Sequence, residues 1–137
     1  MSPSMPPKFV PSVILRHVTP DGQSHFDWMI QLESGRLMTF RVNMRPDETP
    51  GRYAATRLDD HRAAYLDFEG EISGGRGRVT RMARGEVRLL ELADERVVAE
   101  GWYAGTDGTG LRTTSRWTGS RVNADLWEFE RTGANGD

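Results

Sequence analysis

Hydrophobic and polar residues alternate one by one along several short stretches of this chain. In SHFDWMIQL, residues 24–32, the even positions from Phe26 to Leu32 are apolar, whereas the odd positions from His25 to Gln31 are mostly polar. Successive side chains of a β-strand point to opposite faces, so this pattern predicts a strand with one side in a hydrophobic core.

Similar β-like stretches recur along the chain, separated by turn signals such as PDG, ESG and GTDGTG, and helical periodicity is nearly absent. Spacing of about 8 to 12 residues between strand candidates favours an all-β fold, an antiparallel barrel or sandwich with few or no helices, over alternating βαβ units. The other stretches are PSVILRH, RLMTFRVNM, AAYLDFEG, GRVTRMA, EVRLLELA, RVVAEGWY, LRTTSRWT and DLWEFERT.

The chain has the length of one compact domain. With 137 residues, of which 36% are hydrophobic, we expect a single domain over residues 9–131, with a flexible N-terminal segment, 1–8, and a flexible tail, 132–137. No apolar run approaches the roughly 18 residues of a membrane span, and MSPSMPPKFVPS lacks the apolar core of a secretory signal. We therefore expect a cytoplasmic protein that does not enter a membrane.

Composition narrows the chemistry further. The chain has no cysteine, so a metal ion would have to be bound by histidine, carboxylate or water. The net charge of −2 argues against general polyanion binding. Lys8 is the one lysine beside 17 arginines, which fits phosphate recognition or the codon preference of a GC-rich genome equally. The basic run 76–88 fits either the solvated face of an exposed strand or the flank of an active site.

Two of the three histidines and one carboxylate lie close together in the sequence. On a strand, His25 and Asp27 point the same way, roughly 6 to 7 Å apart. His17 precedes the TPDGQ turn, and an antiparallel hairpin would bring it beside them. Two histidines and one carboxylate suit Mn²⁺, Fe²⁺ or Zn²⁺ and leave positions for water or substrate. The alternative is a surface His–Asp pair with an unrelated His17.

The third histidine belongs to DDHRAAYLDFEGEI, residues 59–72, where Tyr65 follows His61 by four positions. Together with HFDWMIQLE, this block resembles the 3′-phosphoesterase domain of bacterial DNA ligase D, the end-healing module of non-homologous end joining. The shared features are a His, then His-aromatic-Asp, and later Asp-His-x-x-x-Tyr leading into Phe-Glu-Gly. The likeness spans roughly residues 10–131 and is specific in these two blocks.

The resemblance implies a compact β-barrel that binds Mn²⁺, or Zn²⁺ or another divalent metal, and removes phosphates or ribonucleotides from DNA 3′ ends. His17, His25 and Asp27 would be the metal ligands. His61 and Tyr65 would contact the scissile phosphate or protonate the leaving group. The expected partners are DNA 3′ ends and, in addition, separate repair ligase or polymerase chains.

The sequence departs from the family pattern on the phosphate side of the site. The residue two after the strand Asp is normally Arg, and here it is Met29. The Lys of the family's next strand falls near VNMRP, where Met44 is followed by Arg45, and the glycine-rich loop SGGRGRV is shorter than in the family. Cation charge could come from elsewhere, and the candidates are Arg16, Arg45, Arg57, Arg76 and Arg78.

Position 29 decides between two kinds of function. It shares a face with His25 and Asp27, so an Arg there would overhang a metal-held phosphate, unless Met29 packs against Met44 in a closed pocket. The first hypothesis is a metal-dependent phosphoesterase. The second is a binding module that keeps the metal or the DNA-end surface without turnover. A small-molecule-binding barrel unrelated to repair is the third, and it would gain support if the three histidines lay far apart.

Aromatic and glycine-rich stretches have simpler interpretations. Trp28 and Trp127 each share a face with other apolar residues, which favours core positions over base stacking. GTDGTG, residues 105–110, has neither a strand-to-helix context nor a following Lys, so we expect a β-turn rather than a phosphate-binding loop.

Overall fold

The fold consists almost entirely of β-strands. The computed structural model describes residues 7–106 and 113–133, and in these ranges it contains nine strands and one short 3-10 helix. No helix in these ranges is long and apolar enough to cross a membrane. The elements are β1 Val10–Val18, β2 Ser24–Gln31, β3 Leu37–Val42, β4 Gly51–His61, η1 Ala63–Leu66, β5 Gly70–Glu71, β6 Arg78–Ala93, β7 Arg96–Gly105, β8 Ser115–Asn123 and β9 Leu126–Gly133.

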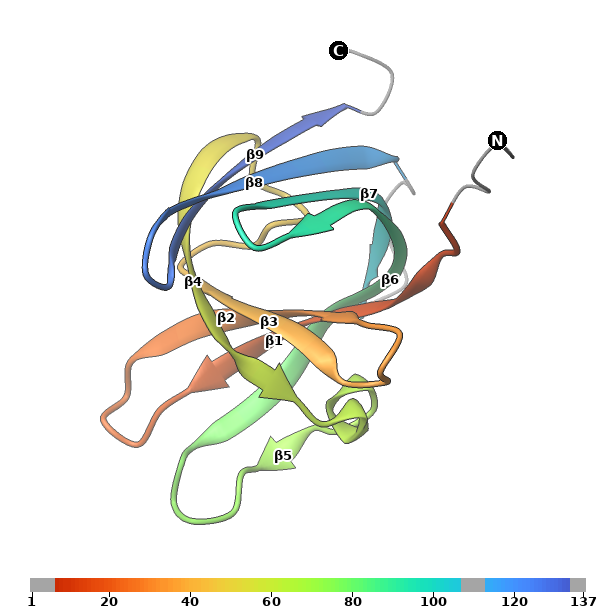
Figure 1. Cartoon of the computed structure of the whole chain (residues 1–137). Helices are drawn as coiled ribbons and strands as arrows, with labels where there is room; N and C mark the ends of the chain where they lie inside the picture. Colours follow the sequence, from red (N-terminus) through yellow and green to blue (C-terminus); the bar gives the residue numbers. More distant parts are fainter. Residues whose placement is uncertain (1–6, 107–112, 134–137) are drawn as a thin grey trace, which may run out of the picture.

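The strands form one antiparallel sheet whose hydrogen bonds close into a ring. Its order is β1-β2-β3-β4-β9-β8-β7-β6-β5, and β6 also pairs with β1. Strand β5 pairs only with the start of β6, outside the ring. Figure 1 shows β1, β2 and β3 on one side of the barrel-like ring and β7, β8 and β9 on the other. The all-β, antiparallel expectation is thus confirmed.

Aromatic side chains fill the interior of the ring. Trp28 lies 5.0 Å from the ring of Phe129 and 5.9 Å from that of Trp117, and all three are at most 1% exposed. Each side chain of this size contributes about 1.5 to 3 kcal/mol when fully buried. The buried indole N–H groups find acceptors, since Trp28 Nε1 donates to the Tyr103 hydroxyl at 2.7 Å and Trp117 Nε1 donates to the Pro46 carbonyl at 2.9 Å. We call this interior the inner cluster.

A second apolar cluster lies outside the ring. It forms where residues 62–77, which contain η1 and β5, fold over the outer face of the β1–β2–β3 side (Figure 1). Because both faces of β1 and β2 are covered here, Val13, Ile14 and Leu15 are all buried although they are consecutive. We call it the outer cluster, and its buried members are Val13, Leu15, Met29, Leu37, Leu66 and Val79.

The sequence predicted most strands but not all. β4 was missed, because its long polar C-terminal part, TRLDDH, hides the alternation that starts at Tyr53. AAYLDFEG was wrongly expected to be β-like, since its first four residues form η1. GRVTRMA and EVRLLELA are one continuous strand, β6, rather than two.

The boundaries of the domain are described only in part. β9 ends at Gly133, two residues past the expected end of the domain at 131. The flexible ends predicted at residues 1–6 and 134–137, and most of GTDGTG, residues 107–110, lie outside the described residues. Trp28 and Trp127 are 1% and 3% exposed, which confirms their core positions.

Candidate metal centre

The β1–β2 hairpin brings the two sequence-adjacent histidines directly opposite each other. The turn between the strands is closed by a hydrogen bond from Thr19 N to Gln23 O of 2.8 Å, with Gly22 at φ +86°. This turn sets a register in which His17 pairs with His25. Asp27 follows His25 on the same face of β2. The hairpin therefore gathers the residues as their spacing predicted.

The three side chains converge on one point, and we call them the triad. His17 Nδ1 lies 3.4 Å from Asp27 Oδ2, and His25 Nε2 lies 3.1 Å from Asp27 Oδ1. One ligand atom from each residue lies within 4.8 Å of the others. The Asp27 residue is only 4% exposed. Two imidazole nitrogens and a carboxylate at this separation form a group that could hold a metal ion.

A backbone hydrogen bond orients the His17 ring and selects its tautomer. Its Nε2 lies 2.8 Å from the carbonyl oxygen of Arg76. A carbonyl can only accept, so the hydrogen-bond network assigns the proton to Nε2. In the neutral ring, Nδ1 then carries an unshared lone pair that faces Asp27. A histidine bound to a metal typically donates its other ring N–H in this way, which fixes the ring and raises the basicity of the ligating nitrogen.

Two buried polar atoms of the triad lack hydrogen-bond partners, and a cation could bind both. His25 Nε2 and Asp27 Oδ1 are close, but they are not aligned for a hydrogen bond, and both are buried without a partner among the described residues. A buried polar atom without a partner costs about 1 to 3 kcal/mol. A divalent ion among the three side chains would satisfy both atoms and the His17 lone pair together. The residues therefore fit a metal ion with two histidine ligands and one carboxylate.

A glycine-rich turn supplies the carbonyl that holds His17. In SGGRG, residues 73–77, Gly74, Gly75 and Gly77 all have positive φ, which places Arg76 in a tight turn closed by Ile72 N donating to Gly77 O at 2.8 Å. At Gly77 a Cβ would lie 2.1 Å from the Val18 carbonyl oxygen, so only glycine fits this close approach to β1. The loop that looked short by comparison with the family thus orients a triad residue.

The second sequence block reaches the same place. A pocket of about 150 Å³ is lined by the triad together with His61, Tyr65 and Arg76, and we call it the metal pocket. The His61 and Tyr65 rings meet edge to face at 5.5 Å. All three histidines thus line one pocket, so the separation that would have favoured the unrelated small-molecule barrel is not found.

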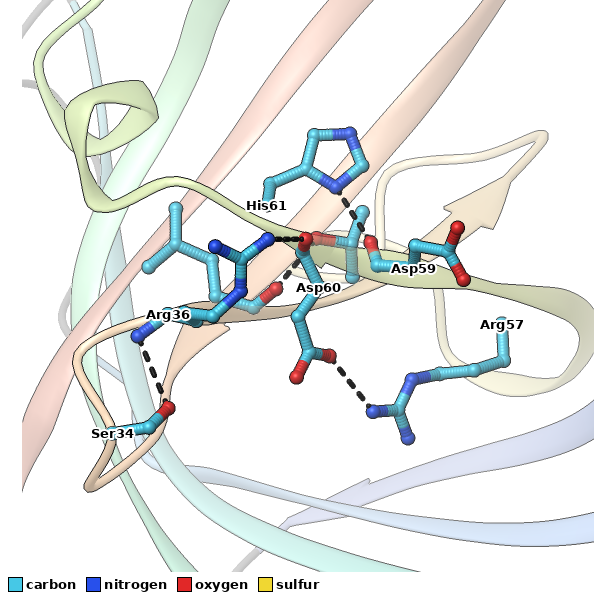
Figure 2. Close-up of polar contacts among 8 residues, drawn as sticks. Ser34, Arg36, Arg57, Asp59, Asp60 and His61 are labelled. Atoms are coloured by element: carbon cyan, nitrogen blue, oxygen red, sulfur yellow. Dashed lines mark hydrogen bonds and ion pairs between the residues drawn. The ribbon is translucent and has the colours of Figure 1, made fainter.

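The backbone of β4 orients His61. Its Nδ1 donates to the Asp59 carbonyl at 2.8 Å, which leaves Nε2 without a hydrogen bond within the described residues. Figure 2 shows the His61 ring on the opposite side of β4 from the Asp60 carboxylate, which binds Arg57. The fixed ring carries its proton on Nδ1, so in the neutral form Nε2 is the nitrogen that can accept one.

Of the five arginines named from sequence, only Arg76 lines the metal pocket. The other four lie elsewhere: Arg16 is exposed on the face of β1 opposite to His17, Arg45 binds Asp47 and Glu48, Arg57 binds Asp60 and covers the Phe40 ring, and exposed Arg78 lies 3.9 Å from Glu71. The basic run 76–88 lies mostly on β6.

Sequence reasoning missed one cation at the pocket. Arg41 on β3 lines the metal pocket and pairs in register with Asp27 across β2 and β3. The signal was present in RLMTFRVNM, where Thr39, Arg41 and Asn43 alternate with the buried Phe40 and Val42. It was overlooked because the family pattern directs attention to position 29.

Met29 closes the apolar wall of the pocket. It is 1% exposed and belongs to the outer cluster, whereas Met44 packs against the inner cluster. The two methionines therefore do not form a closed pocket together. An arginine at 29 would have to enter the packed outer cluster rather than overhang the triad.

We expect Met29→Arg to lower the free energy of unfolding by about 2 to 3 kcal/mol without raising activity. The physical reason is that a longer, charged side chain at position 29 displaces packed apolar neighbours of the outer cluster and loses water there. Urea denaturation checks the change, with Met29→Leu as the size-matched control, which should cost less than about 1.5 kcal/mol. A stable Met29→Arg variant with faster phosphate release would contradict this packing.

No family model and no curated protein matches the chain. The functional assignment therefore depends on the geometry of the metal pocket and on the two sequence blocks that line it.

Proposed function

We propose that this protein is a metal-dependent phosphoesterase that removes 3′-phosphates or 3′-ribonucleotides from DNA ends during end repair. The observation that carries the proposal is the convergence of His17, His25 and Asp27, with His17 Nδ1 turned toward the carboxylate and His17 Nε2 held by the Arg76 carbonyl. The resemblance to the ligase D phosphoesterase domain supports it, because both blocks that carry the resemblance contribute to the metal pocket.

The triad suits the metal that the resemblance implies. Two imidazole nitrogens and one carboxylate oxygen are ligands for Mn²⁺ and equally for Zn²⁺, and they leave positions for water and substrate. When bound, such an ion supplies a Lewis acid for the phosphoryl oxygen and a water of lowered pKa. The protein's part is to hold the three ligands in place: the Arg76 carbonyl orients His17, and β2 presents His25 and Asp27 on one face.

His61 and Tyr65 are the proposed proton-transfer groups. His61 keeps one proton on Nδ1 through the Asp59 carbonyl, so Nε2 is the nitrogen that takes up a second proton from water and then donates it to the oxygen that leaves phosphorus. Tyr65 packs against the His61 ring and lines the same pocket, where its hydroxyl can donate to a phosphate oxygen. Positioned acid–base groups of this kind contribute about 10² to 10⁴ in rate.

The product of this reaction would be a DNA end with a 3′-hydroxyl. A polymerase extends such an end and a ligase seals it, whereas neither can use a 3′-phosphate. Separate repair polymerase or ligase chains are therefore the partners that we propose, in addition to DNA 3′ ends.

One observation favours a second function, a binding module without turnover. The family's phosphate-binding Arg is replaced by Met29, which is buried in the outer cluster. Loss of one charge-assisted contact to the reacting phosphate typically costs about 10² to 10³ in rate. A protein with this replacement could retain metal and DNA ends without hydrolysing them.

Phosphate release from a 3′-phosphate primer-template separates the two functions. With Mn²⁺ we expect slow but measurable release by the unaltered protein, and we expect EDTA to stop it because the triad then lacks its ion. The same primer with a 5′-phosphate instead is the matched substrate control and should release nothing. Metal binding without any release, under Mn²⁺, Zn²⁺ or another divalent ion, would reject the phosphoesterase in favour of the binding module.

A further inference from the structure

Arg41 is the cation best placed to meet a ligand at the triad. In the β2–β3 ladder it lies directly opposite Asp27. Side chains on directly opposed positions of neighbouring strands have Cβ atoms about 4.5 to 5.5 Å apart on the same face. Because Arg41 shares this face with Asp27, it lines the metal pocket, and its residue remains exposed to solvent.

The guanidinium of Arg41 has no ion pair or hydrogen bond with any residue that the structure describes. Other arginines of the barrel wall are engaged: Arg57 binds Asp60 at 3.0 Å, and Arg88 binds Glu100 at 2.7 Å. Arg41 makes no ion pair with Asp27 either, although the two are neighbours. Its five N–H donors are therefore available to an anion in the pocket.

Arg76, the other cation at the pocket, is partly occupied. Its Nε donates to the Ser73 carbonyl at 2.8 Å, and its Nη2 lies 3.4 Å from Ser73 Oγ. These contacts hold its guanidinium back on its own turn. Of the two arginines that line the metal pocket, Arg41 is thus the one whose donors are not already used.

A second hollow continues from the metal pocket past Arg41. It has a volume of about 560 Å³ and shares His25 and Arg41 with the metal pocket. Its other walls are Asn43 and the β1–β2 turn, which offers hydrogen-bonding groups and one carboxylate, that of Asp21, bound to Thr19 and Gln23. Arg41 lies where the two spaces meet. If a longer molecule occupied the hollow, its terminal phosphate would lie beside Arg41.

We propose that Arg41 binds the substrate phosphate and takes the place of the arginine that is absent at position 29. This inference rests on the proposed phosphoesterase function and adds the residue that binds the substrate phosphate. A guanidinium offers two parallel N–H bonds to a phosphate, and it reaches the triad from β3 rather than from β2. Arg41 thereby supplies the charge that Met29 cannot, without requiring a cation in the packed outer cluster.

Inorganic phosphate is the probe for this role, because it is not consumed. Its affinity for the protein is measured by calorimetric titration with Mn²⁺ present, and Mn²⁺ affinity is measured separately. We expect Arg41→Gln to weaken phosphate binding at least about tenfold while Mn²⁺ affinity stays within about twofold, since a charge-assisted contact is lost but no metal ligand. Arg41→Lys should recover part of the affinity, because it keeps the charge but not the planar fork.

Arg52→Gln is the matched control. It removes the same charge from an exposed arginine that pairs with Glu130 at 3.4 Å and does not line the metal pocket. Its phosphate affinity should match that of the unaltered protein within about twofold, because screened surface charge has little effect at this distance. Equal losses in Arg41→Gln and Arg52→Gln, or no loss in either, would overturn the role of Arg41.

The outcomes for the two proposals differ. Absence of phosphate binding by the unaltered, Mn²⁺-loaded protein would overturn the role of Arg41 and leave the metal site intact. Absence of Mn²⁺ binding would overturn the proposed phosphoesterase, and phosphate titration without metal would then still decide whether Arg41 binds the anion. In the active protein, Arg41→Gln should also lower kcat/KM for a 3′-phosphate end by at least about tenfold.

Discussion

The double variant His25→Ala with Asp27→Ala is expected to lose all stabilisation by Mn²⁺. At an ion concentration near 100 times Kd, binding to the native state alone adds about 2.7 kcal/mol, which for a domain of this size corresponds to roughly 10 °C in Tm. The variant lacks two of the three ligand side chains of the triad. Thermal unfolding with and without Mn²⁺ measures the difference.

His61→Ala is the control for this experiment. It removes a histidine from the same pocket but leaves the triad whole, so the Mn²⁺-dependent rise in Tm should survive. If the double variant keeps the rise, the metal binds elsewhere. If His61→Ala loses it, His61 is a ligand rather than a proton-transfer group.

Asp27→Asn is expected to keep or raise the Tm of the metal-free protein, although it weakens the stabilisation by Mn²⁺. Asp27 Oδ1 is buried without a hydrogen-bond partner in the described residues and faces His25 Nε2, whereas Asp27 Oδ2 faces His17 Nδ1. A neutral amide of the same shape can donate from its NH2 group to one of these histidine nitrogens and removes the buried charge, so the Tm without metal should stay the same or rise while Mn²⁺ stabilisation falls. This trade of stability for function is typical of a binding site, whereas a purely structural carboxylate would destabilise the protein when replaced.

The second large effect concerns the rate of the proposed reaction. We expect His61→Ala to lower phosphate release from a 3′-phosphate end by about 10² to 10⁴, because the reaction then lacks the group that exchanges a proton with the leaving oxygen. Single-turnover kinetics with saturating Mn²⁺ measure the loss. Mn²⁺ affinity, measured on the same variant, should change little.

Tyr65→Phe isolates the hydroxyl from the ring. The phenyl ring keeps the packing against His61 and Phe68, so the fold and the orientation of His61 should survive. A smaller loss than in His61→Ala is expected, since a hydrogen-bond donor is removed but the proton-transfer group remains. Unchanged rates in both variants would remove this wall of the pocket from the mechanism.

Local alternation predicted the part of the site that lies within one hairpin. His25 and Asp27 are two residues apart, and a strand period of 2 places them on one face. The PDG turn signal then suffices to bring His17 opposite His25. This half of the site depends on short-range rules alone, and for that reason the sequence revealed it.

Alternation along β3 indicates the face on which Arg41 lies, but it does not place Arg41 beside the triad. Arg41 reaches the triad through the pairing of β2 with β3, and its register depends on the 32–36 turn and on the packing of Phe40 inside the ring. The sequence positions of the five candidate arginines do not show which of them lies beside an open pocket and which lies beside packed side chains. Met29 looked like an empty phosphate position for the same reason, because the outer cluster that buries it is completed by residues 62–77.

The most direct test of the metal centre is a crystal structure of the protein soaked in Mn²⁺, with anomalous diffraction to locate the ion. We predict one anomalous peak among His17 Nδ1, His25 Nε2 and the Asp27 carboxylate, at bonding distances of about 2.0 to 2.3 Å. Arg76 should keep its carbonyl on His17 Nε2, and open coordination positions should face His61 and Arg41. A peak elsewhere, or a triad held together by protons with no ion under saturating Mn²⁺, would contradict the metal centre and with it the proposed phosphoesterase.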